Sequence, residues 1–310
     1  MPKKFFLCPS GERFPIKDCL DGKCSMGERC APYSYLHLAA ADREWKGKIS
    51  TTQGINGTRM EYLKIRHDYA INPASRMFAV IGTRGHAGLE RFANKFSLLE
   101  EKMEDENMTG IIDCLEEQPN GRIWLTDTKV IGAYKICKVL GISRVSIDVP
   151  VLDESGDPVL YKTGKRKGEV KTKKENIIER VEPDAYEYEL QLNRYRIFAE
   201  EALQEEVEQM RLFVIPRDGG TWKADSYGIE NRPYYVQLRR LDDKDVLDYF
   251  EYKKSALMTA LENNVVPPPC TPREAWDGRR CEKYCDVFEQ CRAFGDNPYI
   301  RDGSQDEDDE

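Results

Sequence analysis

The alternation of apolar and polar residues predicts helices and strands in turn along the chain. Segments with apolar residues at helical spacing alternate with short apolar runs that are typical of strands. Helices are predicted over residues 35–40, 58–69, 85–101, 183–210 and 241–264, and strands over residues 109–115, 122–131, 142–151, 210–216 and 234–241. The short apolar run at residues 76–81 fits either a strand or the start of a helix. This order predicts an α/β or α+β core with cysteine-bearing ends.

Two short signals sharpen this pattern. Pro119, Asn120 and Gly121 separate the first two strand-like runs, and Asn and Gly tolerate positive φ, so these runs should form a β-hairpin. Asp242 or Asp243 is expected to cap the last long helix. Residues 1–35 show no sustained period and are expected to form a compact loop region.

Length and composition place the chain among globular proteins. The 310 residues suffice for about two domains, and the apolar runs are far shorter than a membrane-spanning helix requires. Only three apolar residues precede Cys8, too few for a secretory signal, so we expect a cytoplasmic location and no membrane partner. The expected segments are 1–35 rich in cysteine, 36–265 as the core, 266–296 with the second cysteine group, and 297–310 as an acidic tail.

The charge is unevenly distributed. The net charge is −8, but six acids and no base follow residue 301, so the preceding residues carry only −2. A basic insertion at residues 161–180 has eight Lys or Arg against three Glu. Such a segment can follow a DNA strand through phosphate contacts, or it can be a solvated loop; the sequence leaves both open.

A pair of carboxylates and a lysine are the strongest candidates for chemistry. Asp113 lies in one strand of the predicted hairpin, and Asp127 and Lys129 lie in the other. Because side chains alternate along a strand, Asp127 and Lys129 should share a face, and strand pairing can bring Asp113 close to both. Two adjacent carboxylates favour a hard cation such as Mg²⁺ or Mn²⁺, and a lysine beside it can orient water. This combination suits phosphodiester hydrolysis.

Two further pairs have helical spacing. His86 and Glu90 lie one turn apart on the helix predicted before the hairpin, and Gln191 and Tyr195 lie one turn apart on the helix after it.

The order His86, Gly110-x-x-Asp113, Asp127-x-Lys129 and Gln191-x-x-x-Tyr195 resembles the RecB-like branch of the PD-(D/E)XK nuclease superfamily. The similarity spans about residues 30–292 and is greatest to the iron-sulfur members, the CRISPR-associated exonucleases and the AddB-type recombination nucleases. The resemblance implies a restriction-endonuclease-like core, a central mixed sheet flanked by helices. Ile112 stands where the family name has Pro.

The resemblance also implies roles for these residues. His86, Asp113 and Asp127 would bind the metal, Lys129 would be catalytic, and Gln191 and Tyr195 would support the site and the DNA. Glu90 has no firm place in the motif.

Eight of the ten cysteines fall into two terminal groups, which suggests metal ligation in a reducing compartment. They are Cys8, Cys19, Cys24, Cys30 and Cys270, Cys281, Cys285, Cys291. The remaining two, Cys114 and Cys137, are expected to be buried hydrophobes.

The family resemblance implies an iron-sulfur cluster held by one cysteine before the core and three after it. The matching residues are Cys30, Cys281, Cys285 and Cys291, for a 4Fe-4S cluster in preference to 2Fe-2S. The first gap of the C-terminal triad is one residue longer than usual in the family. The alternative is zinc, with Cys8, Cys19, Cys24 and Cys30 forming a tetrahedral site by themselves.

These features together predict a Mg²⁺- or Mn²⁺-dependent deoxyribonuclease with a cysteine-bound metal staple. The resemblance implies exonuclease action on single-stranded DNA or DNA ends in repair, recombination, phage replication or CRISPR immunity, with a helicase, integrase or recombination partner. The competing hypothesis is a non-catalytic, zinc-stapled nucleic-acid-binding or assembly protein that retains the fold.

Overall fold

The computed structural model describes residues 3–41, 45–92, 95–106 and 108–299, with the side chains at positions 86, 87, 89 and 90 excepted. Its contacts divide the chain into two units. The main unit comprises residues 1–127, 187–211 and 237–310, and the second unit comprises residues 128–186 and 212–236. Within the described residues no helix is both long enough and apolar enough to cross a membrane.

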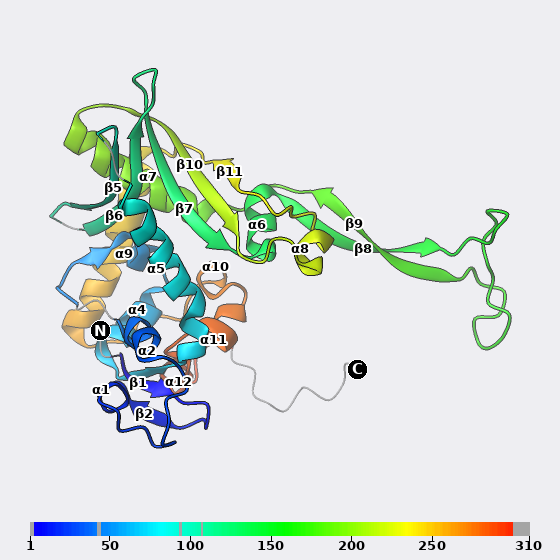
Figure 1. Ribbon diagram of the computed structural model, residues 1–310, viewed down its shortest axis with the longest axis horizontal. Helices are drawn as coiled ribbons and strands as arrows, with labels where there is room; N and C mark the ends of the chain where they lie inside the picture. The colour runs from blue at the N-terminus through cyan, green and yellow to red at the C-terminus, as the bar shows by residue number, and fades with distance from the viewer. Residues whose placement is uncertain (1–2, 42–44, 93–94, 107, 300–310) are drawn as a thin grey trace. The chain divides into compact units, whose positions relative to one another are not determined.

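A central mixed sheet flanked by helices forms the α+β fold, as the sequence predicts at this level (Figure 1). The strand order is β11-β10-β7-β6-β3, with β5 also paired to β6. Strand β6 is antiparallel to β5 and to β7 and parallel to β3. The strands are β3 Ile49–Ser50, β5 Ser97–Glu104, β6 Met108–Glu117, β7 Ile123–Ile131, β10 Val207–Pro216 and β11 Tyr234–Gln237.

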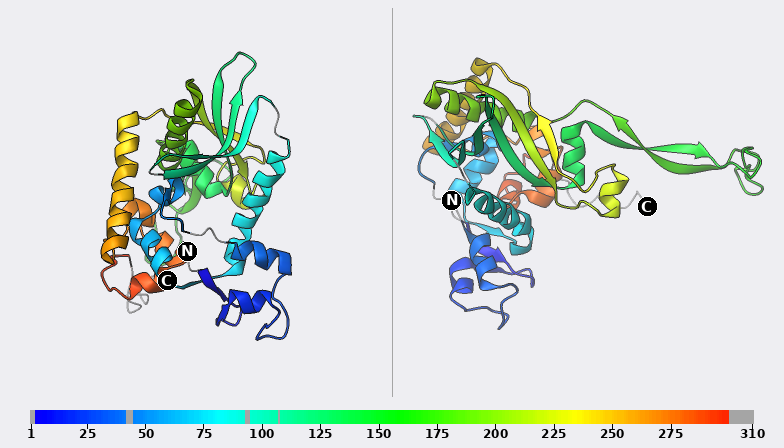
Figure 2. Two further views of the ribbon diagram at one scale, coloured as in Figure 1. Left: turned by 90° about the vertical axis from the view of Figure 1, so that its left-hand side faces the viewer. Right: turned by 45° about the horizontal axis from the view of Figure 1, so that its top comes forward.

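The main unit contains helices from the N-terminal to the C-terminal region of the chain. They are α1 Ile16–Leu20, α2 Tyr33–Ala40, α3 Thr51–Ile55, α4 Thr58–Arg66, α5 Met77–Glu90, α7 Tyr186–Leu203, α9 Asp243–Asn263, α10 Pro272–Ala275, α11 Arg279–Tyr284 and α12 Phe288–Arg292. The left view of Figure 2 shows the length of α9, which packs along α4. Asp242 caps α9, because its carboxylate accepts hydrogen bonds from the backbone of Lys244 and Asp245, as predicted.

The sequence predicts the hairpin of β6 and β7 and the strand β8 correctly, and it misplaces several boundaries. Residues 85–101 are not one helix, because α5 ends at Glu90 and residues 97–104 form β5. Pairing with β6 satisfies the backbone of this segment and outweighs its helical spacing. The long predicted helix at 183–210 ends at Leu203, where Gln204 takes a positive φ of 56° before β10 begins.

The N-terminal region is also more regular than expected. A small sheet has the order β2-β1-β4, in which β1 is antiparallel to β2 and parallel to β4. The strands are β1 Lys3–Leu7, β2 Arg13–Pro15 and β4 Tyr69–Ile71. Because β4 directly follows α4 in the chain, this sheet joins the N-terminal strands β1 and β2 to the segment after α4. The run at 76–81 is the start of α5, after the 3₁₀ turn Pro73–Arg76.

The second unit contains α6 Ala133–Leu140, α8 Trp222–Ser226 and a long two-stranded hairpin. Its strands are β8 Ile142–Pro150 and β9 Thr172–Arg180, which pair from Ile142↔Arg180 to Pro150↔Thr172 (Figure 1). The basic insertion is therefore not a simple loop, because half of it forms β9. We call residues 142–180 the basic hairpin.

Arg59 of α4 binds two residues of the C-terminal region, Pro267 and Asp296. Its side chain is 3% exposed, and its guanidinium donates to the Pro267 carbonyl at 2.6 Å and to both Asp296 oxygens at 2.5 and 2.6 Å. A bidentate pair of this kind has a fixed geometry. Hydrogen bonds from Arg59 hold the pKa of Asp296 below its usual range.

We predict an acid-sensitive contribution from this pair. Because the pKa of Asp296 is lower in the folded than in the unfolded protein, its stabilisation is present above a pH of about 4 and is lost as the pH falls through the folded pKa. Asp296→Asn should therefore lower the melting temperature at pH 7, and the difference from wild type should shrink toward pH 3. Asp248→Asn, at an exposed pair on the surface of α9, is the control and should change little at either pH. A pH-independent effect of Asp296→Asn would contradict the interpretation.

Candidate functional site

The two carboxylates predicted from the sequence lie where β6 and β7 part. The ladder between these strands runs from Glu117↔Ile123 to Cys114↔Thr126. Asp113 and Asp127 are the next residues on each strand, just beyond the last pair. The structure thus places them on neighbouring strands at the end of the ladder, as the hairpin prediction requires.

Asp127 is buried and Asp113 is half-buried. Asp127 is only 1% exposed, which is an unusual environment for a carboxylate. Burial of a carboxylate costs several kcal/mol unless hydrogen bonds or a cation compensate for its charge. A carboxylate in this position is therefore well suited to bind a cation.

Arg211 of β10 stabilises the strand end beside Asp127. Its Nε donates to the Thr126 hydroxyl at 2.9 Å, and its guanidinium lies 4.5 Å from the centroid of the Trp124 ring. The sequence analysis did not identify Arg211, because nothing in its local spacing connects it with a strand that lies more than eighty residues earlier.

Lys129 lies two residues after Asp127 on the same strand and is half-buried. Side chains on a strand alternate between its faces, so the strand itself directs Lys129 and Asp127 to one side. The prediction of a shared face therefore agrees with the observed strand.

Gln191 and Tyr195 are together on α7. The Gln191 amide donates to the Tyr195 hydroxyl at 3.1 Å, and Tyr195 is buried. The Tyr195 ring lies against Gly110 of β6, three residues before Asp113. A Cβ at Gly110 would lie 2.6 Å from the Tyr195 ring, so this position needs a glycine for the close approach of helix and strand.

His86 and Glu90 lie within α5, but their side chains fall outside the described residues. The role of His86 as a metal ligand therefore stays a prediction.

The C-terminal cysteines form one group that includes Cys270. The Asn297 amide lies 3.4 Å from the sulfur of Cys291 and 3.9 Å from that of Cys281. Burial, with a smaller contribution from the charge of Cys281, raises the pKa of Cys270 to about 11 and that of Cys285 to about 12. Asn297 thus contacts the sulfurs of both Cys281 and Cys291.

The N-terminal cysteines form a second group. Burial raises the pKa of Cys8 and of Cys19, and the charges of Cys24 and Cys30 raise both further. The role of Cys30 in a cluster with the C-terminal triad, which the resemblance implies, stays a prediction.

None of the ten cysteines, all of which are described, forms a disulfide. Cys137 is buried, as predicted, whereas Cys114 is only half-buried, with the charges of Glu116, Arg211 and Asp113 near it. Within the part of the chain that the structure describes, no three His, Cys, Asp or Glu side chains are grouped closely enough to hold a metal ion.

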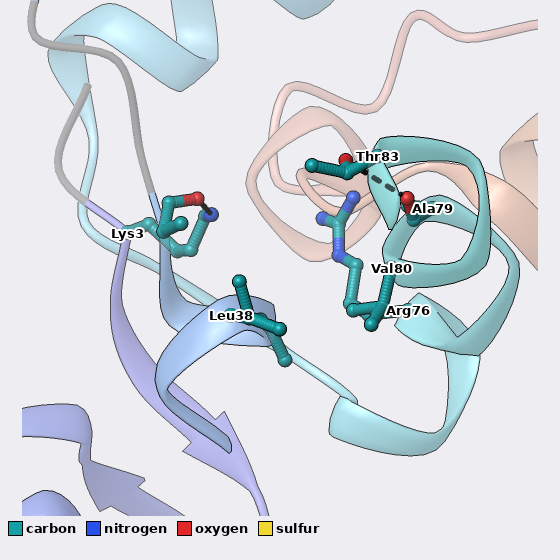
Figure 3. A pocket seen from close by; sticks show the side chains of 8 residues that line it. Lys3, Leu38, Arg76, Ala79, Val80 and Thr83 are labelled. Carbon is teal, nitrogen blue, oxygen red and sulfur yellow. Dashed lines mark hydrogen bonds between the residues drawn. The ribbon is translucent and has the colours of Figure 1, made fainter. Parts of the chain in front are cut away.

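A cavity of about 290 Å³ lies elsewhere in the main unit, between β1, α2 and α5 (Figure 3). Its lining residues are Lys3, Leu38, Ala39, Ala41, Arg76, Ala79, Val80 and Thr83. The Lys3 amine donates to the Ala41 carbonyl, and Arg76 pairs with Asp286. Both cations are engaged, and none of the described lining residues is a carboxylate.

Comparison with known proteins leaves the family open. No protein-family model matches the chain, and no curated protein matches it. Solved structures do match, and one of them is described as "Crystal structure of SSO0001". It is 14% identical, with a TM-score of 0.40 over 84% of this chain and 93% of that chain. This similarity is too weak to carry a conclusion, and membership of the nuclease family stays a prediction.

We predict that Gly110→Ala destabilises the protein, because the added methyl would force the Tyr195 ring away from β6. Overpacking of this kind costs about 1–3 kcal/mol and should appear as a lower melting temperature. Gly82→Ala in α5 is the control, since a Cβ there meets nothing within 4 Å and should raise helix stability by about 0.5–1 kcal/mol. Equal melting temperatures for Gly110→Ala and wild type would refute the close contact.

Proposed function

We propose that the protein is a divalent-metal-dependent DNA nuclease that hydrolyses phosphodiester bonds, with a core of the restriction-endonuclease type. The observation that carries the proposal is the position of Asp113 and the buried Asp127 on neighbouring strands at the end of one ladder, with Lys129 two residues further along. The resemblance adds action on single-stranded DNA or DNA ends.

The donor set suits a hard cation. Asp113 and Asp127 supply carboxylate oxygens, the ligands that Mg²⁺ and Mn²⁺ prefer, and the resemblance adds His86. A bound cation would lower the pKa of a coordinated water and polarise a phosphoryl oxygen. The buried position of Asp127 supports this role, because a cation would offset the cost of burying its charge.

Lys129 would act on the substrate and the attacking water. Its ammonium donates hydrogen bonds, so it can orient the water and balance the negative charge that develops on the phosphate oxygens. Hydrolysis would form a bond from the water oxygen to phosphorus as the water loses a proton to solvent, and it would break the bond to the leaving oxygen, which takes up a proton from solvent. The Gln191 amide would orient the Tyr195 ring within α7, and that ring would keep α7 in place beside β6 through its contact with Gly110.

The basic hairpin would contribute to DNA binding. All seven of its Lys and Arg residues between 162 and 174 are exposed; they are Lys162, Lys165, Arg166, Lys167, Lys171, Lys173 and Lys174. Arg166 also lies over the Tyr161 ring, 4.7 Å from its centroid, and pairs with Glu169. An exposed basic strand and turn can contact phosphates without recognising bases.

We predict that Lys129→Ala lowers the rate of cleavage about 100- to 1,000-fold, because a charge-stabilising donor is lost. Degradation of end-labelled single-stranded and duplex DNA with Mg²⁺ or Mn²⁺ measures this. Lys138→Ala, at an exposed lysine of α6 paired with Asp184, is the matched control and should cleave normally. Equal cleavage by Lys129→Ala and wild type, or no cleavage by folded wild type with either metal, would overturn the proposal and favour a non-catalytic binding protein.

Asp127→Asn should separate catalysis from folding. The substitution removes a metal ligand and also removes a buried charge, so cleavage should fall to background while the melting temperature without divalent metal stays the same or rises. Retained cleavage with Mg²⁺ would exclude Asp127 as a ligand.

We also predict that the basic hairpin sets the salt dependence of DNA binding. Replacing Lys165, Arg166 and Lys167 by Gln should weaken binding of a single-stranded oligonucleotide in EDTA and reduce the slope of log K against log salt by about 2, at about 0.7 for each phosphate contact. The matched control replaces three exposed cations elsewhere, Lys102, Arg122 and Lys244, by Gln. Equal slopes for the two triple variants would show that the hairpin is only a solvated ribbon.

A further inference from the structure

Residues 8–32 have almost no core of their own. Within this fully described segment Cys19 is the one buried residue, at 5% exposure. The segment contains only β2 and the five-residue α1 as regular structure. Burial of apolar surface therefore contributes little to its fold, and small regions of this kind usually depend on a disulfide or a metal.

Three cysteines of this segment start the same kind of turn. The backbone N–H groups of Gly11, Gly22 and Gly27 donate to the carbonyls of Cys8, Cys19 and Cys24, at 2.8, 3.2 and 3.2 Å. Each glycine has a positive φ, between 80° and 86°. Such turns need a residue without a Cβ at their last position. The repeated Cys-x-x-Gly pattern thus places each cysteine at the start of a tight, defined turn.

These three turns and Cys30 supply four thiols within one short segment, and in the described structure their sulfurs are not close enough together to hold a metal ion. Burial raises the pKa of Cys8, and the charges of Cys24 and Cys30 contribute to this shift. Burial also raises the pKa of Cys19, with contributions from the charges of Cys8, Cys24 and Cys30. Arg29 is close to Cys19, where its positive charge opposes that of the thiolates. Its guanidinium also lies 5.5 Å from the centroid of the Tyr33 ring.

The C-terminal thiols have their own set of partners. Burial raises the pKa of Cys270, and the charges of Cys281 and Cys291 contribute to this shift. Burial also raises the pKa of Cys285, with contributions from the charges of Cys270 and Cys281. The sulfur of Cys270 also lies so close to Gly57 that a Cβ there would be 2.3 Å away. Arg59 and Asn297 direct N–H groups to the sulfur of Cys291, at 3.9 and 3.4 Å. N–H groups near sulfur stabilise thiolate ligands.

We propose that Cys8, Cys19, Cys24 and Cys30 form a metal site of their own, of the tetrahedral class that binds Zn²⁺, and that Cys270 completes a separate set with Cys281, Cys285 and Cys291. Four thiolates are the usual number for a closed structural zinc site. Metal binding would bring the four sulfurs together, displace their protons to solvent and replace the missing core of residues 8–32. This inference does not depend on nuclease activity.

The first experiment uses the wild-type chain. The native protein, purified without oxygen, is treated with iodoacetamide, and modified peptides are identified by mass spectrometry with and without EDTA. Cys30 is exposed, so it should react at once if it holds no metal. We expect Cys8, Cys19, Cys24 and Cys30 to be protected together and to become reactive together when EDTA is added. Rapid modification of Cys30 before EDTA would overturn the site.

The second experiment measures zinc and iron per chain in single variants. The wild type should contain about one zinc. Cys24→Ser and Cys30→Ser should both lose this zinc and keep any iron with its absorbance near 400 nm, whereas Cys270→Ser and Cys285→Ser should keep the zinc. Cys137→Ala, in the second unit, is the control and should change neither metal.

The two ligand assignments give opposite results for Cys30. Loss of iron in Cys30→Ser with zinc retained would place Cys30 in the C-terminal cluster and overturn the proposal, as would iron in place of zinc at the N-terminal site or a wild type without zinc. A variant that fails to fold does not affect the test, because the alkylation experiment uses only the wild type. Loss of nuclease activity does not enter either measurement.

Discussion

Burial of the Asp127 carboxylate is the constraint on which the proposed site depends. A negative charge at the centre of a sheet is costly, and the cost is lowest where hydrogen-bond donors or a cation can reach it. Asp127 lies where β6 and β7 stop pairing, just beyond the last pair of the ladder. Thr126, the last paired residue, is held by Arg211 from β10. The buried Asp127 thus lies next to a residue that a contact from another strand holds in place.

The ends of the chain follow a different physical rule. Little apolar surface is buried there, and specific polar and sulfur contacts take its place. Arg59 joins α4 to Asp296 with a bidentate pair, and Lys253 of α9 pairs with Glu274 of α10. Such contacts hold segments together only when their geometry is fixed. The two proposed sites of four thiols would act in the same way, because a bound metal would join several short elements.

A sequence motif and a tertiary neighbour carry different information about the cysteines. Spacing groups Cys281, Cys285 and Cys291 within eleven residues, so the triad is visible in the sequence. Cys270 follows three prolines and lies eleven residues earlier, and nothing local connects it with the triad. The Cys-x-x-Gly pattern is also visible in the sequence, but the hydrogen bonds and the positive φ values that define the turns come from the structure. The choice of partner for Cys30 therefore depends on the folded chain.

The sequence by itself determined the features that arise from neighbouring residues. Asn120 and Gly121 set the turn of the β6–β7 hairpin, Asp242 caps α9, and alternation along β7 puts Asp127 and Lys129 on one side. Only the tertiary structure decided the features that depend on distant segments. Residues 97–104 have helical spacing but form β5, because the edge of β6 offers backbone partners. Gly110 meets Tyr195, and Arg211 meets Thr126, across more than eighty residues of chain. Local spacing cannot encode such contacts, since they form only when packing brings separate elements together.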